Sequence, residues 1–216
     1  MPEDIVYQHP LFGGKIASTF PHRFQDVSNI RQVPDHQEVF ADPSHDESLI
    51  FELLEFKPDV ADNGSAAWFL QDLATEQDAE GSVVIEQSGV LEAPGLMYKN
   101  MPAVVITAVG QMPVLSRTLA SLGGNNDWHV AISKGRQGRE AQNFVKVYLA
   151  NLHLKGVDTD VLVTAYEPIV INPFSESADT VGAGVAVPAA QAGCMPMEEV
   201  FKLAVTSFRV HDWGLF

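Results

Sequence analysis

The chain has 216 residues, of which 46% are hydrophobic and 19% are charged. This length and hydrophobic content exclude a disordered tail and predict a single domain over residues 1–216. The formal net charge of −15 makes nucleic acid and anionic membranes poor partners, because affinity for phosphate groups depends on lysine and arginine. A basic protein surface is the partner that this charge favours.

The sequence has few features that would direct the protein to a membrane, to secretion or to disulfide formation. No apolar run approaches the ~18–20 residues that span a bilayer, so we expect no membrane insertion. The N-terminal stretch Met1-Pro2-Glu3-Asp4 is acidic and lacks the basic and apolar segments of a secretory signal. Cys194 is the only cysteine, which excludes an internal disulfide or a thiolate metal cage. A protein of the nucleus and cytoplasm fits these features.

Charge is sorted along the chain. Residues 24–98 contain sixteen acidic residues and only two basic ones, Arg31 and Lys57. Residues 99–155 reverse the balance, with seven basic residues against Asp127 and Glu140. The need for charged residues on solvent-facing surfaces explains the total number of charges. It does not explain why acidic and basic residues are concentrated in different parts of the chain.

The first half of the chain mixes turns, strands and one helix. Gly13-Gly14 predicts the tight turn of an N-terminal hairpin. Residues 26–31 offer capping side chains for one helical turn, and residues 37–41 have the pattern of a strand. Residues 49–56 are ambiguous, but their length and the following proline favour a strand buried on both faces. Residues 65–77 predict a helix with Ser65 as its N-cap.

The second half is dominated by strand patterns, at residues 83–87, 103–109, 128–133, 144–154 and 159–165. Residues 123–127 predict a turn, and residues 175–193, which are rich in glycine and alanine, predict a flexible loop. The last helix begins near Pro196, with an apolar face formed by Met197, Phe201, Ala204, Val205 and Phe208. The fold class is therefore α+β, an antiparallel sheet covered by helices.

Signatures of catalysis are missing. Gly135-Arg136-Gln137-Gly138 is not followed by Gly-Lys-Ser/Thr, which excludes a P-loop, and no Gly-x-Gly-x-x-Gly or Gly-x-Ser-x-Gly motif occurs. None of the seven histidines has the spacing of metal ligands. We expect no enzyme activity, no cofactor and no metal site.

The remaining functional candidate is the acidic, turn-rich segment 26–40. Polar residues between a rigidifying proline and a strand commonly present a binding epitope, although an ordinary solvated loop has the same spacing.

The segments Leu11-Phe12-Gly13-Gly14, Asp26-Val27-Ser28 and residues 31–40 (Arg-Gln-Val-Pro-Asp-His-Gln-Glu-Val-Phe) closely resemble the signature of the Mog family, the Ran guanine-nucleotide release factors. The likeness continues at residues 47–55, 158–164 and 207–212, while residues 80–138 match only loosely. It implies an antiparallel sheet of about six strands flanked by helices, a fold shared with PsbP-type photosystem proteins.

The resemblance also implies a function. Members of this family bind the nuclear-transport GTPase Ran, promote release of its guanine nucleotide and stabilise the emptied form in nuclear import. Acidic signature residues carry the binding, and here they fall at Asp26, Asp35 and Glu38, with Asp46 and Glu47 as neighbours. The full candidate set for Ran binding is Asp26, Arg31, Pro34, Asp35, Gln37, Glu38, Asp46 and Glu47. Nothing in the sequence requires more than a monomer.

Three other interpretations remain open. A photosystem accessory protein would share the PsbP-like fold, but the sequence lacks its targeting segments. An adaptor for trafficking of a membrane protein would be distinguished by its binding partners. A hydrolase would require a nucleophile motif that is missing.

Overall fold

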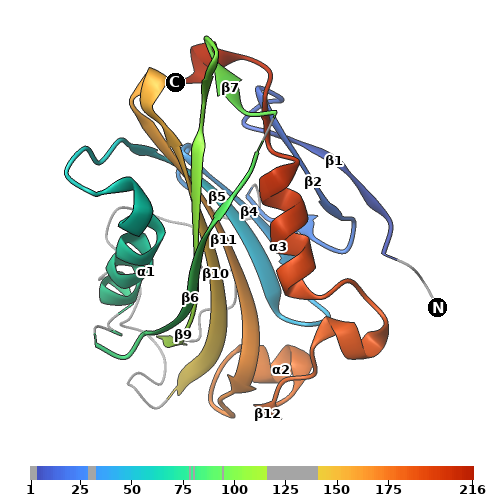
Figure 1. The fold of residues 1–216 in the computed structure, drawn as a ribbon. Helices are drawn as coiled ribbons and strands as arrows, with labels where there is room; N and C mark the ends of the chain where they lie inside the picture. Colours follow the sequence, from blue (N-terminus) through green and yellow to red (C-terminus); the bar gives the residue numbers. More distant parts are fainter. Residues whose placement is uncertain (1–3, 29–32, 78, 80, 94, 116–140) are drawn as a thin grey trace.

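The structure is a computed structural model that describes residues 4–28, 33–77, 79, 81–93, 95–115 and 141–216 (Figure 1). An antiparallel sheet of eight strands runs through it, in the order β3-β4-β5-β11-β10-β9-β6, with β12 paired to β11. Its strands are β3 (Gln25–Asp26), β4 (Gln37–Asp42), β5 (Glu47–Glu55), β6 (Val84–Leu91), β9 (Val104–Leu115), β10 (Gln142–Leu154), β11 (Thr159–Ile171) and β12 (Gly184–Val185). Six of these have six residues or more, which agrees with the predicted sheet of about six strands.

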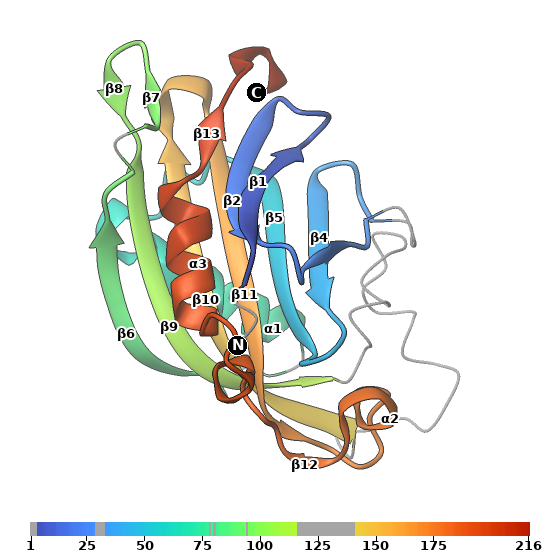
Figure 2. The ribbon, with the colours of Figure 1, turned by 90° about the vertical axis from the view of Figure 1, so that its right-hand side faces the viewer.

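A smaller sheet lies against one face of the large one (Figure 2). It has the order β1-β2-β13, formed by β1 (Val6–Leu11), β2 (Ile16–Pro21) and β13 (Arg209–Val210). The predicted N-terminal hairpin is confirmed, and its turn uses the left-handed backbone of Gly13 and Gly14, with φ of 68° and 82°. Two more short strands, β7 (Met97–Tyr98) and β8 (Met101–Pro102), form a separate pair.

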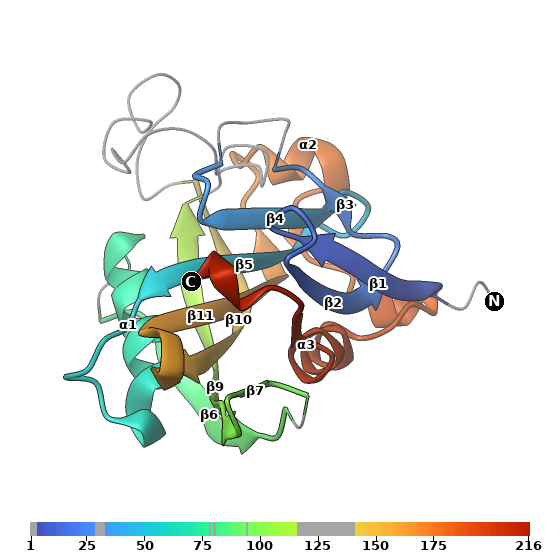
Figure 3. The same cartoon turned by 90° about the horizontal axis from the view of Figure 1, so that it is seen from above.

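The two longer helices cover opposite faces of the large sheet (Figure 3). The described helices are α1 (Ser65–Glu76), α2 (Ser177–Val181) and α3 (Met197–Thr206), with 3₁₀ turns η1 (Asp62–Gly64), η5 (Lys155–Val157), η6 (Ala189–Ala192) and η7 (Trp213–Leu215). None of the described helices has the length and apolar character that crossing a membrane requires.

Each face of the sheet has its own hydrophobic core. On one face, Phe20 of β2 and Phe201 and Val205 of α3 pack over Phe51 and Val163. On the other face, apolar residues of α1 pack over β9, β10 and β11; they include Ala66, Leu70, Ala108, Leu149 and Leu162. The central strands β10 and β11 are buried on both sides, which explains their long runs of valine and leucine.

Several local predictions differ from the structure. Residues 175–193 are not one loop, because they contain α2, β12 and η6. The residue before α1 is Gly64, while the Ser65 hydroxyl donates to the backbone carbonyl of Asp62 and to the Asn151 side chain. Strand β5 is buried mainly in its first half. The predictions for residues 123–127 and 128–133, and part of the helical turn at 26–31, lie outside the described residues.

Candidate partner-binding site

The short strand β3 is fastened to β4 by the motif Asp26-Val27-Ser28. The Asp26 Oδ1 accepts a hydrogen bond from the backbone N–H of Ser28 at 2.8 Å. The Ser28 Oγ in turn accepts from the backbone N–H of Val39 at 2.9 Å. Aspartate is suited to the first bond because its short side chain reaches the backbone two residues away, whereas the serine bond links two neighbouring segments. Asp26 is therefore held exposed at the edge of the large sheet.

Glu38 connects β4 to the N-terminal hairpin. Its Oε1 accepts a hydrogen bond from the backbone N–H of Phe12 at 2.7 Å. Phe12 has a left-handed backbone, with φ of 49°, and it begins the turn that Gly13 and Gly14 complete. Phe-Gly-Gly and Gln-Glu-Val, two separate parts of the sequence signature, thus meet at one carboxylate.

Asp35 occupies the tip of the turn that leads into β4. The backbone N–H of Gln37 donates to the carbonyl of Pro34 at 2.8 Å, which closes a four-residue turn around Asp35 and His36. Both central residues are exposed. A carboxylate at the tip of a braced turn has the position of a contact residue.

Asp26 and Glu38 act on each other electrostatically. Asp26 pairs across the sheet with Phe40, which lies on the same face of β4 as Glu38. Burial raises the pKa of Glu38, and the negative charge of Asp26 raises it further, while the hydrogen bond from Phe12 opposes both effects. Because no described cation pairs with either carboxylate, a basic group from outside would relieve their repulsion.

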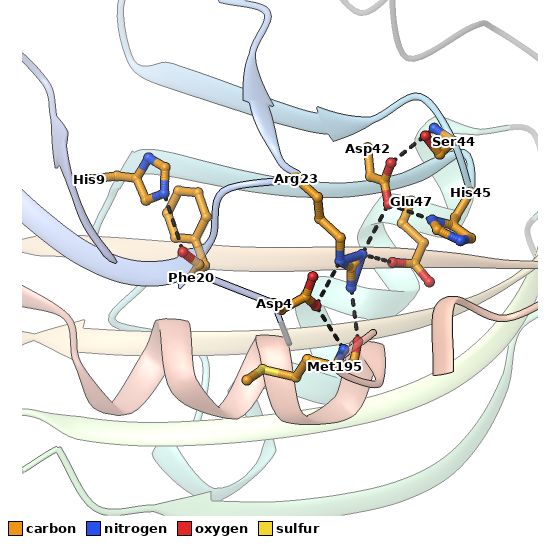
Figure 4. Close-up of polar contacts among 9 residues, drawn as sticks. All are labelled: Asp4, His9, Phe20, Arg23, Asp42, Ser44, His45, Glu47 and Met195. Carbon is orange, nitrogen blue, oxygen red and sulfur yellow. Dashed lines mark hydrogen bonds and ion pairs between the residues drawn. The ribbon is translucent and has the colours of Figure 1, made fainter. Parts of the chain in front are cut away.

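Glu47 lies in a different environment, a buried ion cluster around Arg23 (Figure 4). The Arg23 Nη1 bonds to Glu47 Oε2 at 2.7 Å and to Asp42 Oδ2 at 3.1 Å. The same guanidinium bonds to Asp4 at 3.2 Å and donates to the Met195 carbonyl at 2.9 Å. Only 1% of the Glu47 side chain is exposed, and burial raises its pKa to about 7 despite the neighbouring Arg23. The cluster joins the N-terminal segment, β4, β5 and the start of α3.

Gln37 and Asp46 lie on the face of the large sheet that is opposite to the face carrying Glu38. Gln37 is buried, and its Nε2 donates to Glu52 Oε1 at 2.6 Å. Asp46 follows β4 with a left-handed φ of 55°, and its half-buried side chain bonds to Ser177 of α2. Burial raises the pKa of Asp46, and this hydrogen bond opposes the effect.

The candidate residues therefore do not form one cluster. Asp26 and Glu38 share one face, Asp35 and Pro34 form the adjoining turn, Gln37 and Asp46 serve the other face, and Glu47 is buried with Arg23. Arg31 lies outside the described residues. Arg23 was not predicted, because its partners Asp4, Asp42 and Glu47 lie 19 to 24 residues away in the sequence.

Metal ligation finds no support in the described part of the chain. No group of three or more histidine, cysteine, aspartate or glutamate side chains is placed there to hold an ion. The arrangement offers carboxylates for ion pairing. In the Arg23 cluster three carboxylates share one guanidinium, and the buried Glu47 Oε1 has no hydrogen-bond partner among the described residues.

Comparison with known proteins identifies one protein family that matches this chain. The family described as "Ran-interacting Mog1 protein" matches residues 9–168, which is more than half of the chain. The chain belongs to the Mog1 family. The matched range contains all three carboxylates of the β3–β4 surface, Asp26, Asp35 and Glu38.

Individual Mog1 relatives extend this assignment. A Danio rerio protein named Ran guanine nucleotide release factor is 31% identical over 209 residues, covering 96% of this chain and 98% of its own. A Schizosaccharomyces pombe protein named nuclear import protein mog1 is 27% identical over 160 residues, covering 74% of this chain and 75% of its own. Neither name refers to a photosystem or to membrane trafficking.

A solved structure supports the fold. The crystal structure of the Saccharomyces cerevisiae Ran-binding protein Mog1p covers 99% of this chain and 99% of its own, with a TM-score of 0.62 and 21% sequence identity. This likeness confirms the predicted α+β fold with its antiparallel sheet.

Proposed function

We propose that this protein binds the GTPase Ran, promotes release of its guanine nucleotide and stabilises the nucleotide-free form during nucleocytoplasmic transport. Membership of the Mog1 family and the names of its relatives support this role. The observation that carries the site assignment is the pair Asp26 and Glu38, which face the same side of the sheet edge without a described cation.

The contact surface in this proposal consists of Asp26, Asp35 and Glu38. Glu38 is half-buried and positioned by Phe12, so it can form a desolvated ion pair with a basic residue of Ran. Asp26 and Asp35 are exposed and add charge around it. Glu47 is buried with Arg23, so we assign it the task of holding the local structure rather than touching Ran.

Nucleotide release requires differential binding, not covalent chemistry. A GTPase holds its nucleotide through Mg²⁺, a P-loop lysine and loops ordered by the γ-phosphate. A partner promotes release only if it binds the empty or open state more tightly than the loaded state. Carboxylates can achieve this by pairing with the lysine that the phosphates otherwise occupy, or with basic residues beside the switch loops. The protein thus acts as a regulator in the nucleus and cytoplasm.

Binding of purified nucleotide-free Ran by titration calorimetry tests the site. The variant Asp35→Asn/Glu38→Gln keeps side-chain shape and removes two charges. We expect it to weaken Ran binding by about 2–5 kcal/mol, because one side of a desolvated ion pair is lost. The matched control is Asp59→Asn/Glu92→Gln, which removes two exposed carboxylates elsewhere and should weaken binding only slightly. Equal losses in both variants would leave only general electrostatic attraction and contradict the site.

A further inference from the structure

A cavity of about 450 Å³ lies on the α1 face of the large sheet. Helix α1 packs on β9 and β10, and no helix in the described part of the chain packs closely on the same face of β4 and β5. The cavity occupies the resulting space between α1 and strands β4, β5, β10 and β11. Its volume is in the range of ligand pockets in proteins.

The lining combines an apolar floor with carboxylates. The floor includes Ile50, Leu73, Val145, Leu149 and Leu162. The carboxylates come from three segments; they are Asp46 in the turn before β5, Glu52 and Glu55 of β5, and Asp72 and Glu76 of α1. Lys57 is the only lysine or arginine among the described lining residues. The cavity therefore favours a ligand with an apolar stem and a positive charge.

Burial and mutual repulsion act on the carboxylates inside the cavity. Burial raises the pKa of Glu52, although Gln37 and His36 oppose the effect. Partial burial also raises the pKa of Glu76, and the negative charges of Asp72 and Glu52 raise it further. The Tyr166 hydroxyl lines the same space and has no hydrogen-bond partner among the described residues. A cation between Glu52 and Glu76 would relieve the repulsion and bond to this hydroxyl.

The cavity adjoins the turn that carries Asp35. Pro34, His36 and Gln37 all line it, and Asp35 lies between the first two in sequence. Glu52 is tied to the same turn, since its Oε1 accepts from Gln37 at 2.6 Å and lies 3.5 Å from His36 Nε2. A protein held at Asp35 thus lies next to the cavity.

We infer that the cavity receives a lysine or arginine side chain of Ran, with its aliphatic stem on the apolar floor and its cation between Glu52 and Glu76. This inference rests on the proposed function and deepens it. Basic side chains are suited to the site, because they bury their methylene groups against apolar surface while the charged end pairs with carboxylates. Continuity with the Asp35 turn favours a side chain of the same partner over a separate free amine.

Two variants test the inference through the affinity for nucleotide-free Ran. Glu52→Gln/Glu76→Gln removes the charges and keeps the shape, and Leu73→Trp fills the space without changing any charge. We expect each to weaken Ran binding at least about tenfold, because an ion pair or the volume for the side chain is lost. The control Asp59→Asn/Glu92→Gln should stay within about twofold of the wild type.

A second measurement avoids the variants altogether. Methyl resonances of Leu73 of α1 and Leu149 of β10, which line the cavity, should shift when Ran binds the wild-type protein, whereas those of Leu96, in the other core, should not. Unshifted cavity methyls would overturn the inference even if a variant fails to fold.

The outcomes separate this inference from the function on which it rests. Cavity variants that bind Ran like the wild type, while Asp35→Asn/Glu38→Gln binds weakly, would overturn the inference and leave the function. Equal weakening in the control would also overturn it, because general charge would then suffice. No binding of Ran by the wild type would overturn both proposals.

Discussion

The Glu38 carboxylate accepts the backbone N–H of Phe12 and also lies close enough to Asp26 to be affected by its charge. One oxygen is thus used for structure, and the negative charge of the group remains available to a partner. A substitution that removes the negative charge but keeps the hydrogen-bond acceptor distinguishes these two roles.

Glu38→Ala leaves the Phe12 N–H without its acceptor, so we expect a loss of about 1 kcal/mol in the free energy of unfolding. Glu38→Gln keeps an acceptor oxygen and should lose less than half of that, while still losing most of the affinity for Ran. Urea unfolding and calorimetry measure the two quantities. Equal stability of both variants would show that the Phe12 bond contributes nothing.

Glu47 makes stability depend on pH. Its folded pKa of about 7 lies above the ordinary value near 4.5, so the folded state holds this proton more tightly than the unfolded state. The contribution of a raised carboxyl pKa is present at low pH and is lost as the pH rises from about 4.5 to about 7. Glu47→Gln cannot titrate and keeps the size of the side chain.

We therefore expect the wild type to lose about 2–3 kcal/mol of unfolding free energy relative to Glu47→Gln between pH 4.5 and pH 8. Urea unfolding at several pH values, run in parallel on both proteins, measures this difference. Parallel pH profiles would mean that Arg23 keeps Glu47 ionised throughout.

At the scale of elements, hydrophobic alternation and turn residues predicted most of the described strands and both longer helices. These signals are local, because a strand or helix of this length shows its period in the sequence. Residues 175–193 were wrongly predicted as a loop, because their structure depends on distant contacts. Val170 and Ile171 of β11 pair with β12, and the Asn143 side chain donates to Ser177 of α2.

The sequence predicted part of the candidate site, as it predicted part of the secondary structure. The acidic signature located Asp26, Asp35 and Glu38, but only the fold shows that Glu38 is bound by Phe12. Sequence could not show that Glu47 is buried, because its partner Arg23 is 24 residues away. The cavity could not be predicted from the sequence either, since its lining residues come from five strands and from α1 and α2.

The N-terminal turn gives a prediction at this scale. Gly14 has a φ of 82°, and a Cβ there would meet no atom within 4 Å, so a substitution would cost only conformational energy. We expect Gly14→Ala to lower the unfolding free energy by about 1–2 kcal/mol, and Gly14→Asn by less. Gly89→Ala in β6 is the control and should have little effect, because the Gly89 backbone is not left-handed. Unfolding curves that overlap for Gly14→Ala and wild type would contradict the role of this turn.

For the whole molecule, the net charge of −15 acts on association. Exposed charges steer a basic partner over a distance set by salt, about 10 Å at 0.1 M ionic strength. The specific carboxylates act at contact distance and slow dissociation. Measurements of the association rate and the dissociation rate distinguish general attraction from specific contact.

Raising the salt from about 0.05 M to about 0.5 M should slow association with Ran at least about tenfold and change the dissociation rate much less. Asp59→Asn/Glu92→Gln should reduce the association rate slightly, whereas Asp35→Asn/Glu38→Gln should mainly speed dissociation. Surface plasmon resonance resolves both rates. A site variant that altered only association would place these carboxylates outside the contact.

Release of a fluorescent guanine nucleotide from purified Ran tests the central claim most directly. The wild-type protein should accelerate release in a concentration-dependent manner, and Asp35→Asn/Glu38→Gln should lose most of this acceleration while Asp59→Asn/Glu92→Gln keeps it. Release at the intrinsic rate in the presence of saturating wild-type protein would contradict the account.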